Sequence, residues 1–210
     1  MKIGIFIWRM QPIHLWHERV INKSLEDNDL TFIILWSSWV IDGENNIYTD
    51  KHRKEFLQIL LKKRTKNKIL FIKDTQSEEE WVKNLHSLIE KTWEEYLEAT
   101  LNRLLWSKGI ISNDIQSDRS DFHTYVEHIN FYCWDIKNDY AITIIQKYET
   151  LLNYKKIIYT QINRKDISIN YKWEELYISS SRVREELLKQ NFPLLEKMLH
   201  PKILAKIKKI

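Results

Sequence analysis

The sequence predicts an α/β protein built around a parallel β-sheet, because strand-like and helix-like segments alternate along its first half. Three short apolar runs, at residues 3–7, 30–35 and 68–73, have the length of buried strands. Between them lie segments whose apolar residues recur at helical spacing. Strands joined through helices pair in parallel with right-handed crossovers, and ligands bind such sheets at the carboxyl ends of the strands.

The expected elements follow one another along the chain. The first strand leads into a helix from about residue 18, and a second helix covers residues 49–63 with Thr49 as its N-cap. A long helix begins at Ser77 with an acidic first turn. The elements predicted for the second half are a strand at 102–106, a loop at 108–120, a short helix at 122–129, a segment of undecided type at 141–152, a strand at 156–160, and helices at 181–189 and 194–210.

Composition indicates a globular protein. The chain has 210 residues, of which 43% are hydrophobic and 30% charged, which differs from the make-up of a disordered chain. We therefore expect one domain over residues 1–210, with a helical C-terminal part at about 181–210. Cys133 is the single cysteine. It excludes an internal disulfide and a cysteine-rich zinc site, and it suits a reducing cytoplasm.

Charge and hydropathy narrow the classes of partner. The formal net charge of +4 suits small anionic substrates and does not call for nucleic acid. No apolar run approaches the roughly 18 residues of a membrane helix. The predicted partners are therefore small molecules, with no nucleic acid and no membrane. Whether the chain forms a homo-oligomer is left open.

The connection between the first strand and the first helix carries the most chemistry. It contains Arg9, Gln11, Pro12, His14 and His17. Two histidines three residues apart at a helix start project from one face of its first turn. The free N–H groups and the positive dipole end of that helix lie beside them, so this turn is a predicted anion site.

This turn resembles a family motif. Nicotinamide mononucleotide adenylyltransferases, members of the nucleotidyltransferases with a His-x-Gly-His turn, open with Gly-Arg-Phe-Gln-Pro-Phe-His-x-Gly-His. Residues 8–17 here read Trp-Arg-Met-Gln-Pro-Ile-His-Leu-Trp-His. The resemblance implies a Rossmann-like, parallel-sheet nucleotidyltransferase domain of the HUP type with C-terminal helices.

Further stretches extend the resemblance. Asn46, Thr49 and Arg53 match an Asn-Pro-Phe-Thr segment followed by arginine, although Ile47 replaces the proline. Residues 178–184, Ile-Ser-Ser-Ser-Arg-Val-Arg, resemble the family's Ile-Ser-Gly/Ser-Thr-x-Ile-Arg. Trp81 matches a tryptophan that stacks on the nicotinamide ring in that family. The match is clear over residues 3–56 and 178–205, whereas residues 107–120 and 137–170 fit poorly and their role is left open.

The resemblance implies transfer of AMP from ATP to nicotinamide mononucleotide, giving NAD and pyrophosphate, with Mg²⁺ accompanying ATP. The implied catalytic residues are His14 and His17, acting on the α-phosphate, and Arg9 and Arg184, holding the pyrophosphate. Implied to bind ATP are Ile7, Trp8, Arg9, His14, Trp16, His17, Ser179, Ser180, Ser181 and Arg184. Implied to bind the mononucleotide are Asn46, Thr49, Arg53 for its phosphate and Trp81 for its base. No residue is assigned as a metal ligand.

Two alternatives remain. One is a nucleotidyltransferase with another acceptor, such as phosphopantetheine or a ribityl phosphate, against which residues 46–53 and Trp81 argue. The other is a catalytically inactive paralogue that binds nucleotides, which genuine tryptophans at positions 8, 16 and 36 would favour. The preference among related mononucleotides is also left open.

Glycine is scarce and tryptophan abundant. The chain has 3 glycines and 9 tryptophans, whereas average usage predicts roughly 15 glycines. Trp8, Trp16 and Trp36 fall where the family has glycine, and we assign Trp106 to the same group. We hypothesise that UGA specifies glycine in the source and is translated here as tryptophan. Glycine between the two histidines would let backbone N–H groups approach a phosphate closely.

Overall fold

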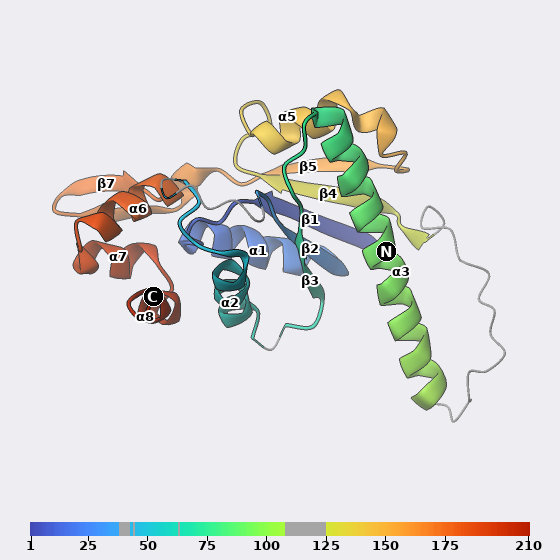
Figure 1. The fold of residues 1–210 in the computed structure, drawn as a ribbon, viewed down its shortest axis with the longest axis horizontal. Coiled ribbons are helices and arrows are strands. Elements are labelled where there is room, and N and C mark those ends of the chain that lie inside the picture. The colour runs from blue at the N-terminus through green and yellow to red at the C-terminus, as the bar shows by residue number, and fades with distance from the viewer. Residues whose placement is uncertain (38–42, 44, 63, 108–124) are drawn as a thin grey trace.

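A five-stranded parallel sheet forms the centre of the molecule (Figure 1). The computed structural model describes residues 1–37, 43, 45–62, 64–107 and 125–210, with residues 104–107 described by backbone alone. The strands are β1 (Lys2–Trp8), β2 (Leu30–Leu35), β3 (Asn67–Phe71), β4 (His128–Cys133) and β5 (Ile157–Gln161), in the spatial order β3-β2-β1-β4-β5. The order reverses between β1 and β4, which makes their carboxyl ends the expected ligand-binding edge.

Helices cover both faces of this sheet (Figure 1). One face packs on α1 (Leu15–Asp27) and α2 (Asp50–Leu61), the other on α3 (Glu78–Ser107) and α5 (Tyr140–Lys147). Successive residues of a strand face opposite sides. Accordingly Phe6 packs with the α1 and α2 side chains, whereas Ile5 and Ile7 pack with those of α3 and α5. Because both faces are buried, residues 3–7 of β1 carry no polar side chain and Thr31 is the one polar residue of β2.

Gly4 permits α1 to lie close to β1. A Cβ atom at this position would come within 2.2 Å of Ser24 Oγ and 2.6 Å of Asn28 Nδ2. Both of those polar groups are buried, and Ser24 Oγ lies 3.1 Å from Thr31 Oγ1 in a hydrogen bond. The glycine therefore fixes the distance between the strand and the helix that carries the two histidines.

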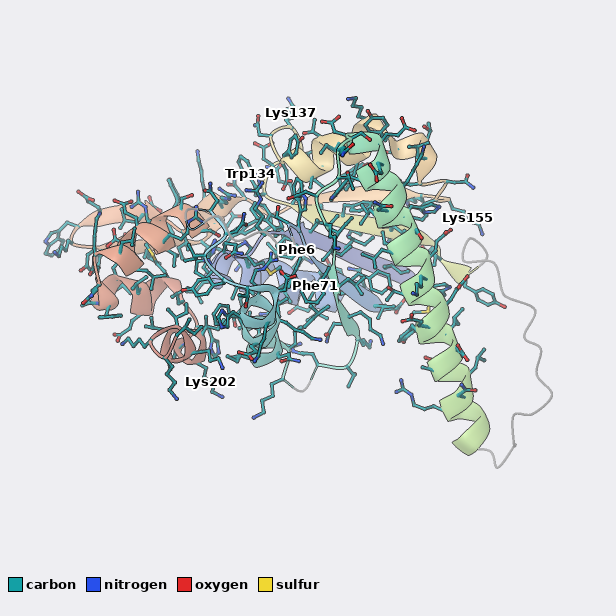
Figure 2. All side chains as sticks on the ribbon, viewed as in Figure 1. Phe6, Phe71, Trp134, Lys137, Lys155 and Lys202 are labelled. Atoms are coloured by element: carbon teal, nitrogen blue, oxygen red, sulfur yellow. The ribbon has the colours of Figure 1, made fainter. Side chains whose placement is uncertain are left out.

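A C-terminal unit packs at the carboxyl end of β1, beside α1 and α2 (Figure 1). It consists of the antiparallel hairpin β6 (Ser168–Tyr171) and β7 (Glu174–Tyr177) and the helices α6 (Ser180–Leu188), α7 (Phe192–Met198) and α8 (Pro201–Ile207). These elements share a hydrophobic cluster of their own. Figure 2 shows Phe6 within the molecule and Lys137 and Lys202 at its periphery.

The predicted fold class is confirmed, and so are the strands expected near residues 3–7, 30–35, 68–73 and 156–160. The strand predicted at 102–106 is wrong, because α3 continues through it to Ser107. The fourth strand is β4, so the helix predicted at 122–129 is wrong at residues 128 and 129, which begin that strand. Residues 122–124 of that helix, and the predicted loop at 108–120, lie outside the described residues. The undecided segment forms α5 and a short 3-10 helix. No helix among the described residues combines the length and hydropathy of a membrane span.

The turn of the unpredicted hairpin places a tryptophan in a glycine-like conformation. Lys172 and Trp173, with φ angles of 49° and 72°, form a two-residue turn between the paired residues Tyr171 and Glu174. Turns with two positive φ angles strongly prefer glycine at the second position. Trp173 is fully exposed, with a relative accessibility of 104%, so no packing offsets its backbone strain. Trp173 thereby joins the positions that suit glycine.

Trp173→Gly is therefore expected to stabilise the protein. A left-handed conformation costs an L-residue about 1–2 kcal/mol, and glycine avoids this cost. Glycine also has more conformational freedom in the unfolded state, which offsets part of the gain. We expect a net gain of about 0.5–1 kcal/mol in the free energy of unfolding, measured by urea denaturation. A loss of stability would show that the indole makes a stabilising contact and would remove this position from the glycine hypothesis.

Candidate active site

Three segments that are distant in sequence meet at the carboxyl end of β1. Gln11 donates from Nε2 to the carbonyl oxygen of Tyr48 and accepts its N–H at Oε1, both at 2.8 Å. Ser180 Oγ donates to the carbonyl oxygen of Pro12 at 3.3 Å, and Arg184 Nη1 donates to that of Gln11 at 2.8 Å. The turn after β1, the segment before α2 and the start of α6 are thus held together, as the sequence motifs require.

A pocket of about 350 Å³ lies at this junction. Arg184 also donates from Nη2 to Asn45 Oδ1 at 3.2 Å and to Ser181 Oγ at 3.3 Å, which fixes its guanidinium at the pocket wall. Ser179 caps α6 by accepting the N–H of Arg182 at 3.2 Å. The lining residues are Ile7, Trp8, Arg9, Met10, Gln11, Trp36, Asn45, Trp134, Asn138, Asp139, Tyr140, Ala141, Ser180, Ser181 and Arg184.

His14 and His17 lie together but behind this pocket. Their ring centroids are 4.0 Å apart, and His17 Nδ1 accepts the backbone N–H of His14 at 3.3 Å. That bond places the proton of a neutral His17 on Nε2. His14 is 3% exposed and His17 0%, and neither lines the pocket. The structure therefore places both side chains in the interior, away from the pocket lining.

Both histidines are neutral at physiological pH. Burial, and then the positive charge of Arg164, lower the pKa of His14 to about 3. Burial, His14 and Arg164 hold the pKa of His17 well below its usual value. Among the described residues, His14 Nδ1 and His17 Nε2 are buried without a hydrogen-bond partner. Such unpaired groups are costly in a stable core, and they are what an absent anionic ligand would satisfy.

Indoles occupy the space beside the histidines. The Trp8 ring lies 5.3 Å from the Trp16 ring and 5.4 Å from that of His17, centroid to centroid. Trp16 is 1% exposed and donates from Nε1 to the carbonyl oxygen of Ile162 at 3.3 Å. Trp8 Nε1 is buried and has no partner in the described part of the chain. The two indoles thus separate the histidines from the pocket.

An aromatic group lies at the other end of the pocket. The Trp36 ring stacks on Tyr140 at 5.6 Å and 8°, and lies 5.2 Å from the Trp81 ring. Arg9 Cζ lies 5.6 Å from the centre of the Trp36 ring. Trp81 is 3% exposed, so in this chain Trp36 fills the place beside it where a flat substrate ring was predicted. Among the other predicted residues, Asn46 is buried and Thr49 caps α2 by accepting the N–H of His52.

Arg53 connects the turns that follow β1 and β2. Its Nη1 donates to the carbonyl oxygens of Arg9 and Trp36 at 2.8 and 2.7 Å, and Nη2 bonds Asp50 and the carbonyl oxygen of Ser37. The side chain is 0% exposed. The predicted contact between Arg53 and a mononucleotide phosphate therefore has no support in this geometry. The sequence did not reveal this, because an arginine in the first turn of a helix is ordinarily exposed.

Arg53→Lys is expected to lower the free energy of unfolding by about 2 kcal/mol. Lysine keeps the charge but loses the planar fork that reaches both turns, and it leaves main-chain oxygens unpaired. Chemical denaturation measures the loss. Arg19→Lys on the exposed surface of α1 is the matched control, and we expect it to change stability by less than about 0.5 kcal/mol. Equal stability of the two variants would contradict the structural role.

Tyr140, Asp139 and Arg164 belong to this region but were not predicted. Burial raises the pKa of Asp139 to about 6, and its Oδ2 lacks a hydrogen-bond partner within the described ranges. All three residues follow the carboxyl ends of β4 or β5. The signal was available in principle, because polar residues directly after parallel strands lie at one edge. For Asp139 and Tyr140 it was missed because the strand at β4 was not recognised, whereas Arg164 follows β5, which was predicted.

Comparisons with known proteins agree on the fold. No family model matches the chain, and no curated protein matches it. A nicotinic acid mononucleotide adenylyltransferase of Plasmodium falciparum, solved with APC, is 16% identical over 99% of this chain and 94% of that chain, with a TM-score of 0.50. The two proteins share a fold. At this identity the likeness extends no further than the fold.

Two other solved structures are similar over part of their length. A bifunctional NMN adenylyltransferase/ADP ribose pyrophosphatase of Francisella tularensis, solved with AMP and manganese, gives a TM-score of 0.46 at 16% identity over 90% of this chain. A NadR protein in complex with NR gives 0.49 at 16% identity, also over 90%. This chain spans only 42% and 43% of those two proteins.

Proposed function

We propose that this chain is an adenylyltransferase that transfers AMP from ATP to nicotinamide mononucleotide, giving NAD and pyrophosphate. One observation carries the proposal. The turn after β1 and the start of α6, the two segments with the sequence motifs, bond to each other and to residues 45–48 at the switch point of the sheet. Ligands of open α/β sheets bind at this edge, so the convergence of both motif segments there supports a shared ligand.

The proposed chemistry needs positioned charge rather than a base. An oxygen of the mononucleotide 5′-phosphate forms a bond to the α-phosphorus of ATP, and the bond from that phosphorus to the β-bridging oxygen breaks. Pyrophosphate leaves with the electron pair. The attacking phosphate is already largely ionised near neutral pH, because its second pKa is about 6. The protein's part is to align the phosphates and stabilise the charge on the transferring group.

Named residues fit these tasks. His17, with its proton on Nε2, and His14 present neutral donors beside the start of α1, whose free N–H groups favour an anion. Arg9, from the turn after β1, and Arg184, from α6, both line the pocket and suit the β- and γ-phosphates. Trp81 lies behind Trp36, which lines the pocket, and suits the flat base if position 36 is glycine. Arg53 positions the turns instead of contacting substrate.

Magnesium fits as an ion carried by ATP. Mg²⁺ commonly binds through one or two carboxylates together with substrate phosphates. Asp139 lines the pocket and has a buried Oδ2 without a hydrogen-bond partner among the described residues, so it suits such a role. When bound, the ion would neutralise phosphate charge. The described residues contain no cluster of three or more His, Cys, Asp or Glu side chains able to hold a metal.

A second candidate function is nucleotide binding without catalysis. The indoles of Trp8 and Trp16 favour it, because they fill the space between the histidines and the pocket. If all the tryptophans are genuine, the pocket keeps Arg9 and Arg184 but a phosphate has no path to His17. If positions 8 and 16 are glycine in the native protein, the indoles that block His17 are absent.

The test is incubation with ATP, Mg²⁺ and separate acceptors, with pyrophosphate and product mass as readouts. The acceptors are nicotinamide mononucleotide, nicotinic acid mononucleotide and phosphopantetheine. The protein is used as printed and with Trp8→Gly, Trp16→Gly and Trp36→Gly together, termed the triple-glycine chain. The proposal expects pyrophosphate and NAD in equal amounts from the triple-glycine chain. Product from phosphopantetheine alone, or none from any acceptor, would contradict it.

A further inference from the structure

Arg164 lies beside Trp8 and Trp16, the two indoles that neighbour the histidine pair. It opens a short 3-10 helix (Arg164–Asp166) three residues after β5, and the side chain of Asn163 caps that helix by accepting the N–H of Lys165 at 2.9 Å. β5 pairs with β4, which pairs with β1, so Arg164 lies at the carboxyl edge of the sheet. The capped helix holds the backbone of Arg164 in place, so its side chain starts from a defined position at this edge.

The guanidinium of Arg164 is surrounded by indoles. Its Cζ lies 4.4 Å from the ring centre of Trp134, 5.3 Å from that of Trp8 and 5.6 Å from that of Trp16. Its Nε is buried without a hydrogen-bond partner in the described part of the chain. A guanidinium has five N–H donors, and ring faces attract its charge without satisfying them. The side chain is thus half-buried, and its Nε lacks an acceptor among the described residues.

The groups around Arg164 favour the binding of an anion. Its positive charge depresses the pKa of His14 and of His17, which places it within electrostatic reach of both rings. Burial lowers the pKa of Arg164 itself, and Asp139 is the carboxylate that opposes this effect. Two neutral donors, a helix start and a partly buried cation therefore surround the space that Trp8 and Trp16 now fill.

We propose that Arg164 holds the transferring α-phosphate of ATP. The inference rests on the proposed function for the identity of the nucleotide, but it concerns a residue outside every motif that suggested that function. Trp134 gives the guanidinium its nearest stacking surface and keeps its orientation when positions 8 and 16 are glycine. The freed N–H groups would then donate to phosphate oxygens, and they would hold the growing charge during transfer without gaining or losing a proton.

The test measures binding, so that it does not depend on turnover. Adenosine, AMP and ATP are titrated calorimetrically into the triple-glycine chain and into its Arg164→Gln and Arg164→Lys variants. Arg103→Gln is the matched control, because it removes the same charge from an exposed position on the far part of α3. Arg164→Gln should weaken AMP and ATP alike by about 10- to 100-fold and leave adenosine unchanged. Arg164→Lys should recover part of the lost affinity. Arg103→Gln should bind AMP and ATP as tightly as the triple-glycine chain, which is the parent of these variants.

Two other results would overturn the role of Arg164. Unchanged AMP affinity in Arg164→Gln removes Arg164 from the α-phosphate, and an equal loss for adenosine shows a structural role. A parent chain that binds no nucleotide defeats both this inference and the proposed function. The two remain separable, because a parent that makes NAD while Arg164→Gln binds AMP normally refutes only Arg164. A parent that binds AMP through Arg164 but makes no dinucleotide refutes only the proposed function.

Discussion

Replacing Trp8, Trp16 and Trp36 by glycine is expected to strengthen ATP binding by at least about 100-fold. In the chain as printed, a phosphate reaches His17 only if the indoles of Trp8 and Trp16 leave their places. Exposing a buried aromatic side chain costs about 1.5–3 kcal/mol, which is roughly 10- to 100-fold in affinity for each ring. Trp36 contributes in the same direction by vacating the space between Trp81 and Tyr140.

Calorimetry or fluorescence titration with ATP measures this change. Trp173→Gly is the control, because it exchanges the same residues at the tip of the hairpin, far from the pocket lining, and should leave ATP affinity unchanged. Equal affinity of the printed and triple-glycine chains would contradict the account of the blocked site. Peptide masses from the native source and the codons at positions 8, 16, 36 and 173 decide the recoding hypothesis, and UGG codons would end it.

His17→Ala in the triple-glycine chain should lower the rate of the chemical step by about 10²- to 10³-fold. This is the scale of losing one donor that is aimed at developing transition-state charge. His17 is fully buried, so some loss of stability is expected too, and the rate is therefore compared at a temperature where both proteins are folded. Single-turnover kinetics separates chemistry from binding.

His128→Ala provides the matched histidine control. His128 begins β4 and so lies at the amino edge of the sheet, opposite the site. It should retain the parent's rate. A His17→Ala protein that turns over as fast as the His128→Ala protein would remove the histidine pair from the mechanism.

The sequence was sufficient to predict the part of the fold in which apolar strands alternate with amphipathic helices. β1, β2 and β3 are apolar runs separated by amphipathic helices, and their order already implied a parallel sheet. β4 was missed because a short apolar run in a strand cannot be told from one turn of helix by periodicity. The same ambiguity placed a strand at residues 102–106, where α3 simply continues.

The site was predictable where residues are close in sequence and was missed where the sheet brings them together. The turn with His14 and His17 and the start of α6 were found by their spacing, although the depth of the histidines was not. Arg164 and Tyr140 reach the same edge only because β4 pairs with β1 and β5 pairs with β4. The burial of Arg53 follows from two turns approaching each other, which no local pattern records.

The central claim is adenylyl transfer, and the fate of the phosphates of ATP tests it most directly. The triple-glycine chain is incubated with nicotinamide mononucleotide, Mg²⁺ and ATP labelled in either the α- or the γ-phosphate, and the labelled products are separated. The account predicts that the α-label appears in NAD and the γ-label in pyrophosphate. A γ-label found on the mononucleotide, or an α-label confined to ADP or AMP, would show phosphoryl transfer or hydrolysis and would contradict it.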